Sequence, residues 1–234
     1  MEHQRIISRM RNTDFTMFML WALTTLLGAA VMALAWKSGW IDRIVVSDTL
    51  YISRTIAGTF VLAYSYLSWR MLQVSRELNV TRSYIKRFRG GENRDELWQL
   101  LRASNSRAAD YAEDYRAALP EDRPIVVEIL KQTLNTKIID IVYYASVLTM
   151  LGFFGTVVGM RMAIGAIDPT VFSNLALVTP MIGEVKEGLA IAIDTTIVGL
   201  VFALWLSLAY RILRRGMAQL FNETMRVGLL YVRQ

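Results

Sequence analysis

The sequence contains no cysteine, and its only histidine is His3, close to the N-terminus. The absence of cysteine excludes disulfide bonds and zinc sites with cysteine ligands. A single terminal histidine excludes Ser-His-Asp and Cys-His catalysis and most transition-metal sites. No GxxxxGK phosphate-binding loop occurs either. We therefore expect a protein that is not an enzyme and that holds no cofactor and no resident metal.

Long hydrophobic stretches dominate the sequence. Hydrophobic residues make up 54% of the 234 residues and charged residues 20%. This is too apolar for an ordinary soluble domain and too charged for a membrane bundle alone, so the charges must be segregated. A membrane-spanning helix needs about 20 mostly apolar residues. We predict an all-α integral membrane protein with four transmembrane helices, at Phe15–Trp36, Leu50–Trp69, Ile138–Ile167 and Gly188–Tyr210.

The distribution of lysine and arginine predicts the orientation, because these residues favour the cytoplasmic side. They are frequent before the first span, between the second and third, and after the fourth, whereas the two short connections contain only Lys37, Arg43 and Lys186. Both termini are therefore predicted to be cytoplasmic, and the pI near 9.7 reflects this bias rather than a nucleic-acid partner. The predicted organisation is a cytoplasmic tail (1–14), a transmembrane hairpin (15–69), a charged helical cytoplasmic insertion (70–137), a second transmembrane helix pair (138–210) and a cytoplasmic C-terminal tail (211–234).

The cytoplasmic insertion has the pattern of charged helices. Gly90-Gly91 marks a break, and the stretch from Arg94 to Leu119 has the apolar spacing of one helix. The "PEDRP" stretch ends that helix, because proline resists helix interiors. A new helix is expected to run from Ile125 without interruption into the third span. The charges form either a solvated surface or a docking surface for a cytoplasmic partner.

The third and fourth spans each carry a line of small residues at alternating steps of four and three, which we call the seams. Small residues let helix backbones approach closely in lipid. Two interpretations stay open: the seams pack on each other within one chain, or both face a shared central object. Counting from the outer ends places Thr156 and Thr196 within one turn of each other near mid-membrane. The seams comprise Ala145, Thr149, Gly152, Thr156, Gly159, Ala163 and Ala166 in the third span, and Gly188, Ala192, Thr196, Gly199, Ala203 and Ser207 in the fourth.

Two motifs in these spans resemble a known family. "LGFFGTVVGM" (Leu151–Met160) is similar to the LGLxGTVxGM signature of the MotA/TolQ/ExbB family, and "AIDTTIVGL" resembles its last-helix motif. The resemblance is specific over about 138–210, and four spans with an insertion after the second fit the MotA-like plan. The insertion is short for a flagellar stator. By motif position, Thr156 and Thr196 match the pore-facing hydroxyls, and Gly155, Gly159 and Gly199 match the close-approach glycines.

The resemblance implies an ion-conducting, stator-like subunit of the bacterial inner membrane. Five such subunits surround a dimer of a single-span MotB/TolR/ExbD-like partner, which carries an essential membrane aspartate. Proton or sodium flow past that aspartate drives mechanical work. Two other classes remain alternatives: a stand-alone secondary transporter and a passive membrane scaffold. The transporter is less favoured because the first two spans do not form an internal repeat with the last two, and because the fourth span has no mid-helix break.

Three hydroxyls, those of Thr156, Thr195 and Thr196, are the candidate ion pathway. Threonine in a membrane helix often donates back to the carbonyl four residues earlier, which would make these residues structural. Alternatively, they offer oxygens to an ion beside the partner's carboxylate. A proton needs only a hydrogen-bonded relay, whereas sodium needs several oxygen ligands, which the three threonines together would help to supply.

The charged residues inside the spans are Asp194, Arg161 and Arg54. Asp194 lies about 200° around its helix from Thr196, so it is not expected to face the pore. Intramembrane charges usually pair, and all three residues are predicted at similar depth. We expect Asp194 to be held by Arg54 or Arg161, within or between subunits. A place in the ion path and exposure to lipid are the alternatives.

Overall fold

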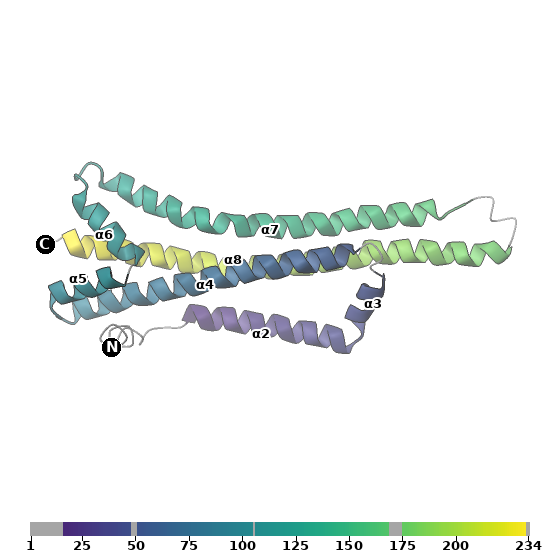
Figure 1. Cartoon of the computed structure of the whole chain (residues 1–234), viewed down its shortest axis with the longest axis horizontal. Helices are drawn as coiled ribbons and strands as arrows, with labels where there is room; N and C mark the ends of the chain where they lie inside the picture. Colours follow the sequence, from purple (N-terminus) through teal and green to yellow (C-terminus); the bar gives the residue numbers. More distant parts are fainter. Residues whose placement is uncertain (1–15, 48–50, 105, 169–174, 233–234) are drawn as a thin grey trace. The chain divides into compact units, whose positions relative to one another are not determined.

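The structure is a computed structural model that describes residues 16–47, 51–104, 106–168 and 175–232. Within these residues all regular structure is helical, which confirms the all-α prediction. The order of the helices is shown in Figure 1: α2 (Thr16–Lys37), α3 (Trp40–Ser47), α4 (Ile52–Arg89), α5 (Arg94–Ala103), α6 (Arg107–Ala117), α7 (Arg123–Gly165) and α8 (Leu175–Val232).

Three of the described helices are long and apolar enough to cross a membrane: α2, α7 and α8. The start of α4, which the sequence predicts as the second span, falls short of them in hydropathy. It contains Arg54 and several serine, threonine and tyrosine residues among its apolar ones. One face of this segment nevertheless carries buried apolar residues at helical spacing: Ile56, Phe60, Ala63 and Leu67.

Aromatic side chains hold this part of α4 against α8. The rings of Phe60 and Phe202 stack with centroids 4.4 Å apart, and the Trp205 ring lies 5.4 Å from Phe60. Tyr64 adds an edge-on contact to Trp205 at 5.8 Å, and its hydroxyl forms a 2.6 Å hydrogen bond with the Thr25 hydroxyl of α2. A span that packs on neighbouring helices along one face needs less hydropathy than a span surrounded by lipid.

Three helices are longer than the spans predicted within them. The helices α4 and α7 each continue without a break from an apolar into a charged segment. Helix α8 begins 13 residues before Gly188 and ends at Val232, so most of the predicted C-terminal tail is helical. Apolar residues continue to recur there at helical spacing and are buried: Leu213, Met217, Leu220 and Val227. A short helix, α3, occupies part of the connection before α4, where no helix was predicted.

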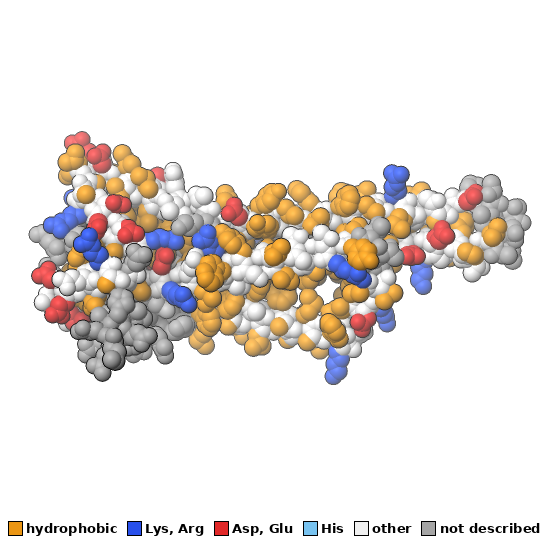
Figure 2. All heavy atoms as spheres, in the orientation of Figure 1, with side chains coloured by type: hydrophobic (Ala, Val, Ile, Leu, Met, Phe, Trp, Pro, Cys, Tyr) orange, Lys and Arg blue, Asp and Glu red, His pale blue; other side chains and the backbone are white. Residues whose placement is uncertain are grey.

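The chain divides into two compact units. The first contains residues 1–23, 67–140 and 210–234, and the second contains 24–66 and 141–209. The borders between the units therefore lie at 23/24, 66/67, 140/141 and 209/210, and the predicted division into tails, spans and insertion stays a prediction. Figure 2 shows many hydrophobic side chains over the middle part of the second unit, with charged side chains towards the end drawn on the right. Lysine, arginine, aspartate and glutamate are also frequent over the first unit.

The single helix predicted over 94–119 is wrong, because the structure has two helices there, α5 and α6. Helix α5 ends at Ser104, whose hydroxyl donates to the Leu101 carbonyl at 2.6 Å. Serine competes for backbone partners in this way and favours helix ends. The turn lets both helices bury their apolar faces in one cluster, whose fully buried members include Leu97, Leu101, Ala108, Ala109 and Ala112 with Tyr84, Ile85 and Val227.

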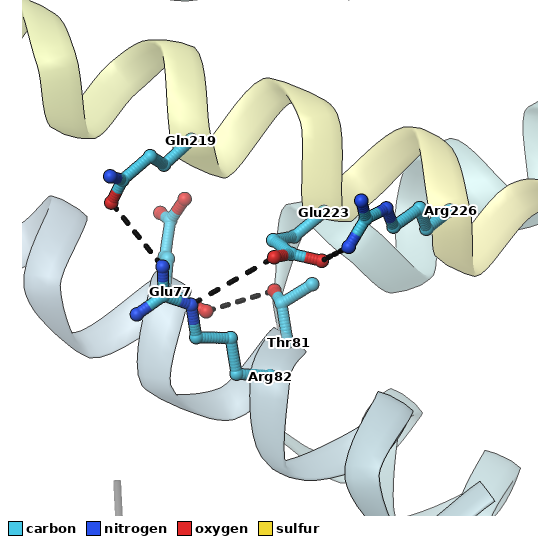
Figure 3. Close-up of polar contacts among 6 residues, drawn as sticks. All are labelled: Glu77, Thr81, Arg82, Gln219, Glu223 and Arg226. Atoms are coloured by element: carbon cyan, nitrogen blue, oxygen red, sulfur yellow. Dashed lines mark hydrogen bonds and ion pairs between the residues drawn. The ribbon is translucent and has the colours of Figure 1, made fainter. Parts of the chain in front are cut away.

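Polar contacts join α4 to α8 within the first unit (Figure 3). Arg82 of α4 donates to the Gln219 side chain at 3.3 Å and lies 4.0 Å from the Glu223 carboxylate. Arg226 donates to the other oxygen of Glu223 at 3.2 Å, so one carboxylate serves two guanidinium groups. Within α4, the buried Thr81 hydroxyl donates to the backbone carbonyl oxygen of Glu77 at 2.9 Å.

Tyr111 of α6 is buried, and its ring lies against Gly228 of α8. Burial, and secondarily the neighbouring Tyr115, raises the pKa of Tyr111 from 10.0 to about 12. The folded first unit therefore holds this proton more tightly than the unfolded chain does. The corresponding stability is present below about pH 10 and is lost as the pH rises towards 12.

We expect the variant Tyr111→Phe to reduce the alkaline loss of stability, because it keeps the ring against Gly228 and removes the ionising group. Thermal unfolding of the purified protein, followed by circular dichroism at pH 9 and pH 11, measures this. Tyr51→Phe is the control, since Tyr51 is exposed. If the unfolding midpoint of Tyr111→Phe falls between pH 9 and pH 11 as much as that of the wild type, Tyr111 is not the source of the alkaline loss of stability.

Candidate functional site

The two seams face each other in the structure. Helices α7 and α8 lie side by side in the second unit (Figure 1), and seam residues of one helix lie against the backbone of the other. A Cβ built on Gly199 would stand 2.9 Å from the Cα of Gly152 and 2.9 Å from the Leu148 carbonyl oxygen. Real Cβ atoms do not approach this closely, so glycine is required at such a crossing. Packing within one chain therefore accounts for the seams at these glycines, and the alternative that the seams face a shared central object stays a prediction.

The contact continues along both helices. A Cβ built on Gly159 would reach the Ala192 backbone and, at 2.6 Å, the Gly188 carbonyl oxygen. One on Gly188 would stand 2.9 Å from the Cα of Ala163. Ala163, Ala192 and Ala203 are buried, and in lipid such close approach supplies dispersion contacts that association otherwise lacks. The seam residues Gly152, Gly159, Ala163, Ala192 and Gly199 lie in this contact, together with Gly155, which the motif predicted as a close-approach glycine.

Thr156 and Thr196 meet at the centre of the contact. Their hydroxyl oxygens are hydrogen-bonded to each other across the two helices. Thr156 also lies 3.2 Å from the Gly152 carbonyl of its own helix and 3.3 Å from the Ala192 carbonyl of α8. Thr196 lies 3.0 Å from the Ala192 carbonyl and 3.5 Å from the Gly152 carbonyl. The structure therefore brings together two hydroxyl and two carbonyl oxygens.

The hydroxyl pair can be polarised in two directions. Each threonine has one proton to donate, and the bond between the hydroxyls uses one of the two. In one arrangement Thr156 donates to Thr196, which donates to the Ala192 carbonyl. In the other, Thr196 donates to Thr156, which donates to the Gly152 carbonyl. Both arrangements satisfy every donor, and both side chains are half-buried rather than sealed from the surface.

Thr195 is placed differently from the other two threonines. It is 1% exposed, and its side chain lies against Gly155, where no Cβ could be accommodated. Its hydroxyl donates within α8, to the Ile191 carbonyl at 2.8 Å. The sequence placed Thr195 only at the edge of the seam, and the structure makes it part of the helix contact. A role for Thr195 in holding an ion stays a prediction.

The charged residues of the spans differ in exposure and in their contacts. Asp194 is half-buried and Arg161 is exposed. Arg54 donates to the Val45 carbonyl of α3 at 3.3 Å, and its guanidinium carbon lies 4.7 Å from the centre of the Tyr51 ring. The pairing of Asp194 with Arg54 or Arg161 stays a prediction. Among the described residues, no three His, Cys, Asp or Glu side chains are grouped to hold a metal ion.

The sequence did not predict the contact of α2 with the rest of the second unit. Gly28 lies directly against the indole ring of Trp205, and a Cβ there would overlap the ring. The hydrogen bond between Thr25 and Tyr64 lies one turn before it on α2. Gly28 and Thr25 stand three residues apart, so they share one face of α2, and this spacing was the available signal.

Large apolar side chains cover the outer faces of α7 and α8 in the second unit. They point away from the seams and are exposed in the single chain. Such a surface suits lipid or other membrane helices, as expected of a membrane protein. The exposed residues include Met150, Phe153, Phe154, Val157, Met160 and Ile164 on α7 and Ile193, Leu200, Val201 and Leu204 on α8.

A comparison with protein families matched residues 112–225 to the MotA/TolQ/ExbB proton channel family. A search of curated proteins and a search of solved structures gave no match. The matched segment includes α7, most of α8, and both motifs on which the resemblance was based. The resemblance inferred from the sequence is therefore confirmed: residues 112–225 of this chain match the model of the MotA/TolQ/ExbB proton channel family.

Proposed function

We propose that the chain is the ion-conducting subunit of an ion-driven membrane motor. Five copies surround a dimer of a single-span partner that carries a membrane carboxylate, and ion flow past this carboxylate is coupled to mechanical work. The membrane is the bacterial inner membrane, with both termini in the cytoplasm. The observation that carries the proposal is the hydroxyl pair of Thr156 and Thr196, which lies within the segment matched to a proton channel family.

The hydroxyl pair has the properties that a proton relay needs. It reverses its polarity without leaving a donor unsatisfied, so a proton accepted on one side can be released on the other. In an apolar membrane, oxygens arranged in advance replace the water that a passing ion would otherwise need. Because no water chain has to be reordered, a pair held by two rigid helices serves this purpose better than mobile side chains.

We also propose that the chain crosses the membrane four times, with the start of α4 as the second span. Its buried face and its aromatic contacts with α8 support this, since a helix packed on other spans along one face tolerates lower hydropathy. An even number of spans places both termini and the α5–α6 segment on one side. The excess of lysine and arginine in those segments makes that side the cytoplasm.

The ion is proposed to be a proton, with sodium as the alternative. The two hydroxyl and two carbonyl oxygens provide a relay, but Thr195 turns its hydroxyl back to its own helix. A cluster of three threonine oxygens, which would favour sodium, is therefore not assembled in the single chain. The family match names a proton channel, in agreement with this preference.

Purification of the tagged chain in mild detergent from its native membranes tests the proposal. Native mass spectrometry is expected to show five copies of the 26.7 kDa chain with two copies of a smaller single-span protein. A stable monomer or dimer in the presence of that protein would contradict the proposed assembly. Reconstituted in liposomes with a proton gradient, the complex should conduct protons, and substitution of the partner's membrane carboxylate should abolish this conduction.

A further inference from the structure

Along the exposed face of α8, the side chains change from apolar to positively charged within one turn. Leu200, Leu204 and Leu208 are 52%, 63% and 48% exposed, and successive members are one helical turn apart. The next turn on the same face carries Arg211, followed by Arg214 and Arg215, all exposed. A single helix thus passes from a leucine stripe to an arginine stripe within one turn. This is the pattern of a helix that leaves the hydrocarbon of a membrane and enters its headgroup layer.

Aromatic residues mark similar transitions in α4 and α7. In α4, the exposed Trp69 directly precedes Arg70. In α7, the exposed rings of Tyr143 and Tyr144 follow the exposed Asp140. Tryptophan and tyrosine are enriched at membrane–water interfaces, where the ring meets acyl chains and the polar end meets water. Each of these helices therefore carries the signature of the same kind of boundary.

The three arginines after the leucine stripe differ from other arginines of the first unit in their partners. Arg82 and Arg226 share Glu223, Arg102 pairs with Glu113 at 3.2 Å, and Arg107 pairs with Glu77 at 3.4 Å. Within the part of the chain that the structure describes, Arg211, Arg214 and Arg215 form no ion pair and no hydrogen bond. Three guanidinium groups on one helix face are thus available to an external anion.

We propose that Arg211, Arg214 and Arg215 bind the phosphate groups of anionic phospholipids in the cytoplasmic leaflet. Guanidinium groups bind phosphate through paired hydrogen bonds, and clustered basic residues just inside a span attract anionic headgroups. The leucine stripe places acyl chains beside the same helix face, so headgroup and tail contacts belong to one lipid. This favours a lipid over an acidic protein surface, which would leave the leucine stripe uninvolved.

Such a contact would fix the depth of α8 in the membrane. Arg211, Arg214 and Arg215 lie on the same continuous helix, Leu175–Val232, as the leucine stripe. The inference rests on the membrane location of α8 and on its arginines, and it does not require the proposed ion conduction.

The test compares lipids and variants in detergent solution. Purified protein is mixed with dioleoyl phosphatidylglycerol or dioleoyl phosphatidylcholine, and the unfolding midpoint and the lipids retained in native mass spectrometry are measured. Phosphatidylglycerol is expected to raise the midpoint by roughly 2–4 °C or more, and phosphatidylcholine much less. The gain should shrink in 0.5 M NaCl because salt screens exposed charges. It should disappear in the variant Arg211→Gln/Arg214→Gln/Arg215→Gln.

Controls separate the proposed site from general charge effects. The variant Lys86→Gln/Arg89→Gln removes two exposed cations at the distant end of α4 and should keep the full gain. The variant Arg211→Lys/Arg214→Lys/Arg215→Lys should keep part of it. An equal response of wild type to both lipids, an equal gain in the triple glutamine variant, or the same gain with inorganic phosphate would overturn the proposal. If the triple glutamine variant does not fold, the proposal is tested by the wild type alone: its unfolding midpoint is compared between the two lipids and between low salt and 0.5 M NaCl.

Discussion

Replacing Gly159 by alanine is expected to lower the free energy of unfolding by about 1–3 kcal/mol or more, because overpacking a close contact forces the backbone apart. The added Cβ would meet the Ala192 backbone and, at 2.6 Å, the Gly188 carbonyl oxygen. Backbone atoms cannot move aside as the end of a flexible side chain can. The two helices would have to separate, and the hydroxyl pair would separate with them.

Thermal unfolding in detergent, followed by circular dichroism and by size-exclusion chromatography, measures this loss. Gly58→Ala is the matched control, because Gly58 lies in a helix of the same unit with nothing within 4 Å of an added Cβ. That change should be neutral or stabilising by up to about 1 kcal/mol, since alanine favours helix over glycine. Equal behaviour of the two variants would show that α7 and α8 are not in close contact.

The double variant Thr156→Val/Thr196→Val is expected to reduce ion flux about tenfold to hundredfold while the assembly survives. Valine keeps the shape of threonine and removes the oxygen, so the helix contact is preserved. A hydrogen bond to a charged group contributes about 1.5–3 kcal/mol, which corresponds to this range of rates. The carbonyls of Gly152 and Ala192 keep their helical partners, so the loss of stability should be mild.

Flux in liposomes, with a proton gradient alone and then a sodium gradient alone, measures the effect. Thr59→Val is the control, because its hydroxyl donates only to the Thr55 carbonyl of its own helix, at 2.9 Å. Wild-type flux in the double variant would remove the ion-pathway role and leave the threonines as packing residues. Thr195→Val separates the ions: we expect little effect for protons, and a loss confined to sodium would place Thr195 among sodium ligands.

The sequence by itself determined the class of the protein. Hydropathy, the segregation of charge and the seams predicted a helical membrane protein, because burial in lipid leaves few choices of composition. The two motifs led to the family that the comparison then confirmed. Counting residues along two antiparallel helices placed Thr156 and Thr196 at one depth, because the rise per residue of a helix is fixed.

Only the tertiary structure decided what each face meets. Periodicity shows which residues share a face of a helix, but it does not show what that face meets. A seam that packs on the neighbouring helix of the same chain and a seam that faces another object have the same sequence pattern. The contacts of Gly152 with Gly199 and of Gly159 with Ala192 turn both seams towards each other. Thr195 is buried against Gly155 for the same reason: helices in such close contact also enclose the residues beside the seam. The turn at Ser104 likewise exists because two short helices bury more apolar surface in one cluster than one straight helix can.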